Sequence, residues 1–483
     1  MTGVTEVPGD RSTIVQVRGI PGTVARTSTQ LFTRLNAAFG PGTVLRRRAA
    51  NIGHMLSGNA ASALFAIISL SMAMRSLGPE QAGLLALVIS YARLIERITR
   101  FESWQPLIKY AATIKGPDSA QDLRQLYGFG LRLDIIACLV AALLAVALAL
   151  VGNALFGLSG ESVTLILIYS IALLFNVTGM PTAVLRMSGR FKTIAYVQAS
   201  GNLLRIGVCY YGLVNDSPLA FFAFAWAGCQ VFAVALLLLL ASLDLRRQRV
   251  GNPLTVSCSG VTRRFPGIMG FAWSSNLSMT IRSSANDFDV LVVGWFADPA
   301  SAGLYYFAKR FAKAVQQLNA QVQAVLYPDV ARLWADGAYS AFAKLTAQIQ
   351  KLLAGCFVVL FLLVLAFGHL IIRYGPGEQF SGALPMLLIQ IIAVGLSTHA
   401  APSRTALLAM GRATSILNIV LIGTIVFQIV MFTLVPWFGA MGANAAHVVL
   451  ALICAIGFDT VVRRELKQVR ADDGPDVQRS EKR

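Results

Sequence analysis

Charged residues are scarce in this sequence. Only 13% of the 483 residues are charged, whereas soluble domains average about 25%. Apolar residues make up 56% of the chain, and the mean hydropathy is +0.64. Because a soluble chain of this length needs a larger polar surface, the composition excludes an ordinary soluble fold and indicates a membrane protein.

Motifs of common enzyme and metal sites are also lacking. The sequence contains neither a GxxxxGK(S/T) phosphate loop nor a GxSxG elbow, so we expect no ATP hydrolysis by this chain. Its six cysteines include no CxxC pair, and together with the four histidines they form no cluster with metal-ligand spacing. We therefore predict a protein that is not an enzyme and that binds no metal or cofactor.

The chain is nevertheless strongly basic, with a formal net charge of +18. Lysines and arginines collect at the ends of apolar runs, which is typical of membrane topology rather than of nucleic-acid binding, so no nucleic-acid partner is expected. Residues 1–50 have no apolar core and are not a cleaved signal peptide. We interpret them as a disordered basic cytoplasmic tail near anionic lipid headgroups, with a regulatory docking arm as the alternative.

Apolar runs long enough to span a bilayer recur along the chain. A spanning helix needs about 20 mostly apolar residues. The sequence predicts twelve such segments, at 52–77, 82–109, 125–151, 162–185, 193–214, 217–243, 267–296, 302–327, 349–372, 382–408, 414–436 and 440–462. The second, seventh and eighth are unusually polar. The predicted fold class is an all-α integral membrane protein.

The distribution of basic residues supports this count. With the N-terminus inside, lysines and arginines fall in the inner loops, and Arg373 is the one basic residue of the predicted outer loops. A missing or additional helix would invert this alternation midway along the chain. We therefore predict an even number of helices with both termini in the cytoplasm.

Two short motifs repeat at nearly the same offset. Pro79 and Gly83 open the second segment, and Pro299 and Gly303 open the eighth, 220 residues later. Gly-Arg pairs at 189–190 and 411–412 are related by an offset of 222. Six helices return the chain to the same side, so the two halves share one orientation, and the repeat predicts two pseudo-symmetric six-helix bundles with a transport site between them. The predicted domains are a tail at 1–50, bundles at 51–245 and 267–465, a cytoplasmic linker at 246–266 and a cytoplasmic tail at 466–483.

Several segments carry ionisable residues at membrane depth, where such groups usually face a cavity or a partner. Spacings of i, i+4 and i+7 place three cations of the second segment on one face, and three polar side chains of the eighth share a face in the same way. We interpret them as a cationic cavity for an anion, because guanidinium groups bind phosphate bidentately. The candidate substrate-binding residues are Arg93, Arg97, Arg100, Arg282, Lys309, Arg310, Lys313 and Gln316. Candidates for ion coupling are Glu96, Asp287 and Asp289.

Internal pairing is the alternative to a cavity. Arg93 could pair with Glu96, Arg97 with Glu102 and Arg282 with Asp289, and each charge would then be neutralised within the fold. Arg97 and Arg100 could also extend their heads to the membrane surface. The eighth segment favours the cavity, because it offers three cations and no acid of its own.

These residues resemble a known family. Residues 75–79, Arg-Ser-Leu-Gly-Pro, with Gly83 are similar to the R-x-LGP-x-x-x-G signature of polysaccharide flippases in the multidrug/oligosaccharidyl-lipid/polysaccharide exporter superfamily. The resemblance extends over about 50–465. In the second half it includes a stretch with Asp289, Gly294, Phe296, Pro299, Gly303 and Tyr305. It also includes a later Gly-rich turn at 439–443.

The resemblance implies two bundles around a central cavity that opens alternately to each side. It implies flipping of undecaprenyl-diphosphate-linked oligosaccharide across a bacterial plasma membrane for O-antigen, capsule or exopolysaccharide synthesis, with a polysaccharide polymerase and a chain-length regulator as partners. One alternative is a cation-coupled small-molecule antiporter of the multidrug type, which would depend on acidic residues. The other is a membrane polysaccharide polymerase, which the short outer loops of roughly 4 to 11 residues disfavour.

Overall fold

The computed structural model describes residues 44–100, 103–114, 119–156, 160–273, 276 and 288–472, with the backbone alone at 44–60, 153–156, 318–325 and 470–472. The chain divides into two units, 1–54 and 55–483. The first unit is described only by helical backbone from residue 44, so the following concerns the second. The candidate site residues Arg282 and Asp287 lie outside the described residues.

The described residues are helical and contain no strand. Helices of the first half are α2 (Val44–Thr99), α3 (Trp104–Ala111), α4 (Ser119–Phe156), α5 (Gly160–Leu174), α6 (Gly179–Met187), α7 (Phe191–Val214) and α8 (Leu219–Arg247). The connection holds η1 (Pro253–Thr255) and α9 (Val261–Arg264). The second half holds α11 (Phe288–Phe296), α12 (Pro299–Ala335), α13 (Tyr339–Tyr374), η2 (Glu378–Phe380), α14 (Ala383–Ala409), α15 (Ala413–Phe438) and α16 (Ala440–Asp472).

The all-α membrane fold predicted from the sequence is confirmed. Over the residues that could be searched, 8 spans are long and apolar enough to cross a membrane. Helix α2 contains two predicted segments, divided where Gly78 leaves helical geometry at a φ of 75° just before Pro79. Helices α5 and α6 together form one span with a break between them. Over these residues, α7 and α12 fall outside the 8 apolar spans, because charged and amide side chains interrupt them.

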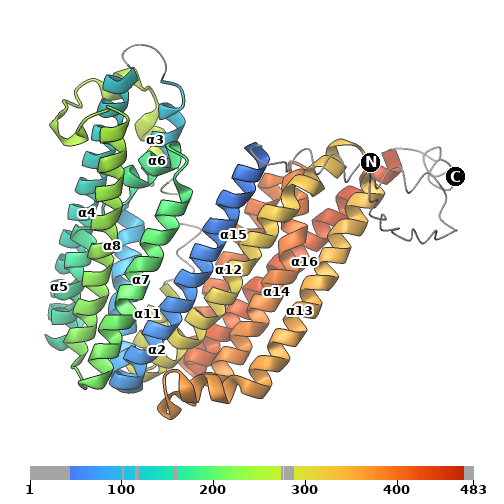
Figure 1. Ribbon diagram of the computed structural model, residues 1–483. Coiled ribbons are helices and arrows are strands. Elements are labelled where there is room, and N and C mark those ends of the chain that lie inside the picture. The colour runs from blue at the N-terminus through green and yellow to red at the C-terminus, as the bar shows by residue number, and fades with distance from the viewer. Residues whose placement is uncertain are drawn as a thin grey trace, which may run out of the picture. The chain divides into compact units, whose positions relative to one another are not determined.

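Helix contacts fall into two groups that follow the chain. In the first, α4 packs on α5, and α5, α6 and α7 pack on α8. In the second, α12, α13 and α16 pack on α14, and α15 packs on α16. In Figure 1 the green α7 and α8 run side by side, and the yellow to red helices α12–α16 form the other group.

The Pro–Gly repeat joins the two halves reciprocally. A Cβ atom on Gly83 would lie 1.6 Å from the carbonyl oxygen of Pro299, and one on Gly303 would lie 2.5 Å from that of Pro79. Because glycine has no side chain, each of the two leaves space for the backbone of the other half. Any other residue at either position would displace that backbone. We call these four residues the Pro–Gly crossing.

The Gly-Arg repeat has the same structure in both halves. Gly189 and Gly411 adopt φ angles of 69° and 75°, which favour glycine. Each following arginine reaches the last helix of its own half: Arg190 lies 3.0 Å from Asp244, and Arg412 lies 2.9 Å from the carboxylate at residue 465. The offset seen in the sequence thus reflects equivalent turns, each held by an ion pair.

The connection between the halves packs on the first group. The Arg124 Nε atom on α4 donates to the carbonyl oxygen of Asn252 at 2.9 Å, and Arg264 pairs with Asp122 at 2.6 Å.

The helical region also extends further than the predicted segments, since α2 begins at residue 44 and α16 ends at residue 472. Hydropathy marks only the part of a helix that lies in the hydrocarbon, so charged helical ends such as 463–472 are read as tails.

Candidate functional site

The predicted cationic face of α2 is partly buried, and Arg100 in it forms an ion pair. Arg100 lies 2.8 Å from Glu96 on the preceding turn, and its other terminal nitrogen donates to the hydroxyl of Thr178. The remaining cations of this face, Arg93 and Arg97, are also partly buried. Arg100 therefore links α2 to the break between α5 and α6 and is neutralised by Glu96.

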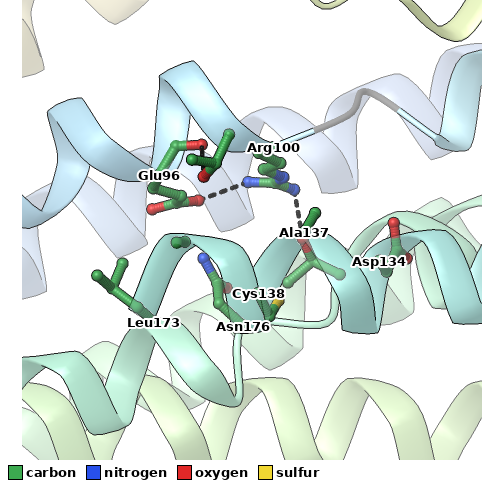
Figure 2. Close-up of a pocket in the computed structure, with 10 residues that line it drawn as sticks. Glu96, Arg100, Asp134, Ala137, Cys138, Leu173 and Asn176 are labelled. Carbon is green, nitrogen blue, oxygen red and sulfur yellow. Dashed lines mark hydrogen bonds and ion pairs between the residues drawn. The ribbon is translucent and has the colours of Figure 1, made fainter. Parts of the chain in front are cut away.

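A small polar pocket lies at this helix break. It is lined by Glu96 and Arg100 from α2, by Asp134 and Cys138 from α4, and by Asn176 before α6. In Figure 2, Glu96 and Arg100 face Cys138 and Asn176 across the pocket. Interrupted helices with exposed backbone groups recur at transport sites.

Asp134 holds the start of α6. Its carboxylate accepts from the Ser103 hydroxyl at 2.5 Å and from the backbone N–H of Met180 at 2.7 Å. A Cβ atom on Gly179 would lie 1.8 Å from the Ser103 hydroxyl oxygen, so glycine is required there. A carboxylate is well placed at a helix N-terminus, where backbone N–H groups are unsatisfied. Asp134 is therefore a structural cap that fixes the broken helix.

Arginines from three helices, two in the first half and one in the second, interact electrostatically. Arg310 on α12 lies within electrostatic range of Arg93 on α2 and of Arg205 on α7. Aromatic rings support two of them: the Arg310 guanidinium lies 5.5 Å from the ring centroid of Tyr306, and that of Arg205 lies 5.1 Å from Trp226. The Arg205 Nε atom is buried and, within the described part of the chain, has no hydrogen-bond partner. We call Arg93, Arg205 and Arg310 the arginine group.

The cationic side of α12 faces a pocket beside α2. Arg310, Lys313 and Gln317, spaced i, i+3 and i+7, line this pocket opposite Ala63 and Ala66. The sequence predicts a face formed by Lys309, Lys313 and Gln316, and of these Lys313 lines the pocket. Because each residue rotates the helix by about 100°, Lys309 points to a different side of α12 from Arg310, and Gln316 is exposed without lining the pocket.

Lys309 and Asp289 form a buried ion pair. The fully buried Asp289 carboxylate accepts from the Lys309 ammonium at 2.6 Å and from the Tyr305 hydroxyl at 2.5 Å, and His447 Nε2 lies 2.7 Å away. Lys309, a candidate for substrate binding, and Asp289, a candidate for ion coupling, are therefore each other's counter-ions. Buried charges require such pairing. Tyr305 and His447 were not singled out as site residues from the sequence, and no local pattern links His447 to Asp289 across 158 residues.

Comparisons with known proteins agree on family and fold. A model of the family described as "Polysaccharide biosynthesis protein" matches residues 72–385. The chain is 29% identical over 277 residues to the inner membrane protein YghQ of Escherichia coli K12, covering 57% of this chain and 78% of YghQ.

Two solved structures show the same arrangement of helices. The lipid II flippase MurJ in an inward closed conformation matches with a TM-score of 0.63 and 13% identity, covering 84% of this chain and 88% of MurJ. An inward-facing multidrug resistance MATE transporter of the MOP superfamily matches with a TM-score of 0.62 and 12% identity, covering 87% and 96%. At such identities these likenesses establish the fold of a multi-pass membrane protein.

Proposed function

We propose, since the chain belongs to the polysaccharide biosynthesis protein family, that it flips undecaprenyl-diphosphate-linked oligosaccharide repeat units across a bacterial plasma membrane. It acts as a transporter rather than an enzyme, by alternating access between its two halves. Both termini lie in the cytoplasm. The flipped units supply O-antigen, capsule or exopolysaccharide synthesis, where a polymerase and a chain-length regulator are the partners.

The arginine group is the observation that carries this proposal. The guanidinium groups of Arg93 on α2 and Arg205 on α7 both lie within electrostatic range of Arg310 on α12, and both also lie within such range of Tyr169 on α5. Their mutual repulsion in a low-dielectric environment is relieved when an anion binds among them. A diphosphate has the charge and the oxygen geometry that guanidinium forks bind bidentately. Lys313 and Gln317 extend the site along α12 and suit the sugar that follows the diphosphate.

A multidrug-type antiporter is less well supported. It would need an acidic group available to a cationic substrate or ion, yet the three acids described in the membrane near these sites already accept from donors. Glu96 pairs with Arg100, Asp134 caps α6, and Asp289 pairs with Lys309. The arginine group would also repel a cationic drug.

The proposal predicts that flipping depends on Arg205 and Arg310. In vesicles containing the purified protein and a fluorescent undecaprenyl-diphosphate-linked sugar, Arg205→Met or Arg310→Met should slow flipping about tenfold or more, because a hydrogen bond to a charged group contributes about 1.5–3 kcal/mol. Flipping is measured as the fraction of probe that becomes accessible to an external quencher.

Arg332→Met is the matched control, because this arginine is exposed near the end of the same α12 helix. It should leave the rate unchanged. In cells, Arg93→Ala and Lys313→Ala should lower polymer output at equal protein levels. Wild-type flipping in both Arg205→Met and Arg310→Met would contradict the assignment of the diphosphate site.

A further inference from the structure

We propose that the pocket between α2 and α12 binds a carboxylate, so that the oligosaccharide flipped by this chain contains an acidic sugar. The inference rests on the proposed function and names the class of sugar beside the diphosphate. The polar lining comes from α12 and the facing lining from α2, with Arg310, Lys313 and Gln317 opposite Ala63, Ala66 and Ile67. Two cations and an amide thus share the pocket with apolar side chains, and no acid is among the described residues that line it.

The pocket has the size of one acidic group rather than of a whole sugar ring. Its cavity volume is about 40 Å³. Because about 10–15 Å³ of such a cavity holds one water molecule, the pocket has room for a group of a few heavy atoms, such as a carboxylate. The small side chains of Ala63 and Ala66 leave this space on the α2 side, and Gln317 is the exposed member of the lining. The acidic group therefore enters the pocket while the sugar ring stays outside it.

The pocket adjoins the proposed diphosphate site. Arg310 lines the pocket and also belongs to the arginine group. Lys313 follows Arg310 by three residues, which places it on the same face of α12 and about 4.5 Å further along the helix axis. A group bound at Lys313 therefore belongs to the sugar next to a diphosphate bound among the arginines.

The charge of Lys313 gives the pocket a preference for an acid. Its ammonium group is partly buried, and an ammonium is a compact charge with three donors and no acceptor. A carboxylate accepts through both oxygens, and hydrogen bonds between ionised groups are roughly twice as strong as those between neutral groups. A neutral sugar offers hydroxyl groups alone, so it satisfies the ammonium less well. The difference grows in the low-dielectric interior of a membrane protein.

Two lipid-linked sugars that differ in one group test the inference. Both carry a fluorescent disaccharide on undecaprenyl diphosphate, with glucuronic acid next to the diphosphate in one and glucose in the other. In vesicles containing the purified protein, below saturation, the acidic lipid should be flipped about tenfold faster, which corresponds to about 1.4 kcal/mol. The ratio of the two rates does not depend on the amount of folded protein, because misfolding lowers both rates equally.

Variants of Lys313 show whether its charge sets this ratio. Lys313→Gln keeps a polar side chain without the charge and should lower the ratio to near one. Lys313→Glu should invert the ratio, because a carboxylate in the pocket repels the acidic sugar. Lys344→Gln is the matched control, because Lys344 is an exposed lysine of α13, and it should leave the ratio unchanged.

Binding of the two lipids in detergent, followed by fluorescence anisotropy, gives the same comparison without transport. Equal rates and equal affinities for the two lipids, or an unchanged preference in Lys313→Gln, would overturn the carboxylate pocket and leave the proposed function standing. Tighter binding of the acidic lipid by a protein that flips neither lipid would retain the pocket and refute the proposed function instead.

Discussion

Lys309→Met should lower the free energy of unfolding by about 3 kcal/mol, whereas Arg310→Met should leave it unchanged or raise it. Removing Lys309 leaves the fully buried Asp289 without its counter-ion, and breaking a buried pair in this way costs about 3–5 kcal/mol. We expect the lower end, because the denatured chain in a membrane or detergent also finds polar partners. Unfolding in a denaturing-detergent titration measures both effects.

Arg310→Met differs because Arg310 faces other arginines rather than a carboxylate. Its removal relieves repulsion and loses a cation–π contact with Tyr306 of about 0.5–1 kcal/mol. The two adjacent cations of α12 should therefore affect the free energy of unfolding differently, because Lys309 stabilises the fold whereas Arg310 belongs to the proposed substrate site.

The double variant Lys309→Met/Asp289→Asn supplies the control. A neutral amide no longer needs a counter-ion and can still accept from the Tyr305 hydroxyl. It should regain most of the stability that Lys309→Met loses. If Lys309→Met were as stable as the wild type, or Arg310→Met were the less stable of the two, the assignment of the two cations to different environments would be wrong.

The distinction between Lys309 and Arg310 could not be made from the sequence. Lys309 and Arg310 are both cationic, and polar residues follow on either side of them. The sequence pattern therefore predicts cations on α12 without showing which of them faces the pocket. The partners of Lys309 decide the matter: it pairs with Asp289 and lies over the Tyr305 ring, and His447 contacts the same carboxylate. These partners come from α11, α12 and α16, and no local spacing predicts that they meet.

Arg205 shows a different limit. It is absent from the candidate site predicted from the sequence, because a single arginine on a mostly apolar helix has no periodic partner. Its contact with Trp226 on α8 and its proximity to Arg310 arise only when three helices pack. By contrast, the all-α membrane fold and the repeat could be predicted, because apolar length and the recurrence of proline and glycine are local properties of the chain.

Gly83→Ala should destabilise the protein by about 3 kcal/mol, although alanine is the better helix former. The new Cβ atom would lie 1.6 Å from the Pro299 carbonyl oxygen, so the α2 and α12 backbones would have to move about 2 Å apart to restore van der Waals separation. Overpacking typically costs about 1–3 kcal/mol. The upper end applies here, because two backbones yield less readily than a side chain can.

Gly207→Ala is the matched control, because Gly207 lies in helix α7 with no atom within 4 Å of the Cβ position. Alanine gains about 1 kcal/mol in helix propensity over glycine, so this variant should be at least as stable as the wild type. Thermal unfolding in detergent compares the two, and Gly303→Ala should behave like Gly83→Ala because the crossing is reciprocal. Equal stability of Gly83→Ala and Gly207→Ala would show that the two halves do not approach each other closely at the Pro–Gly crossing.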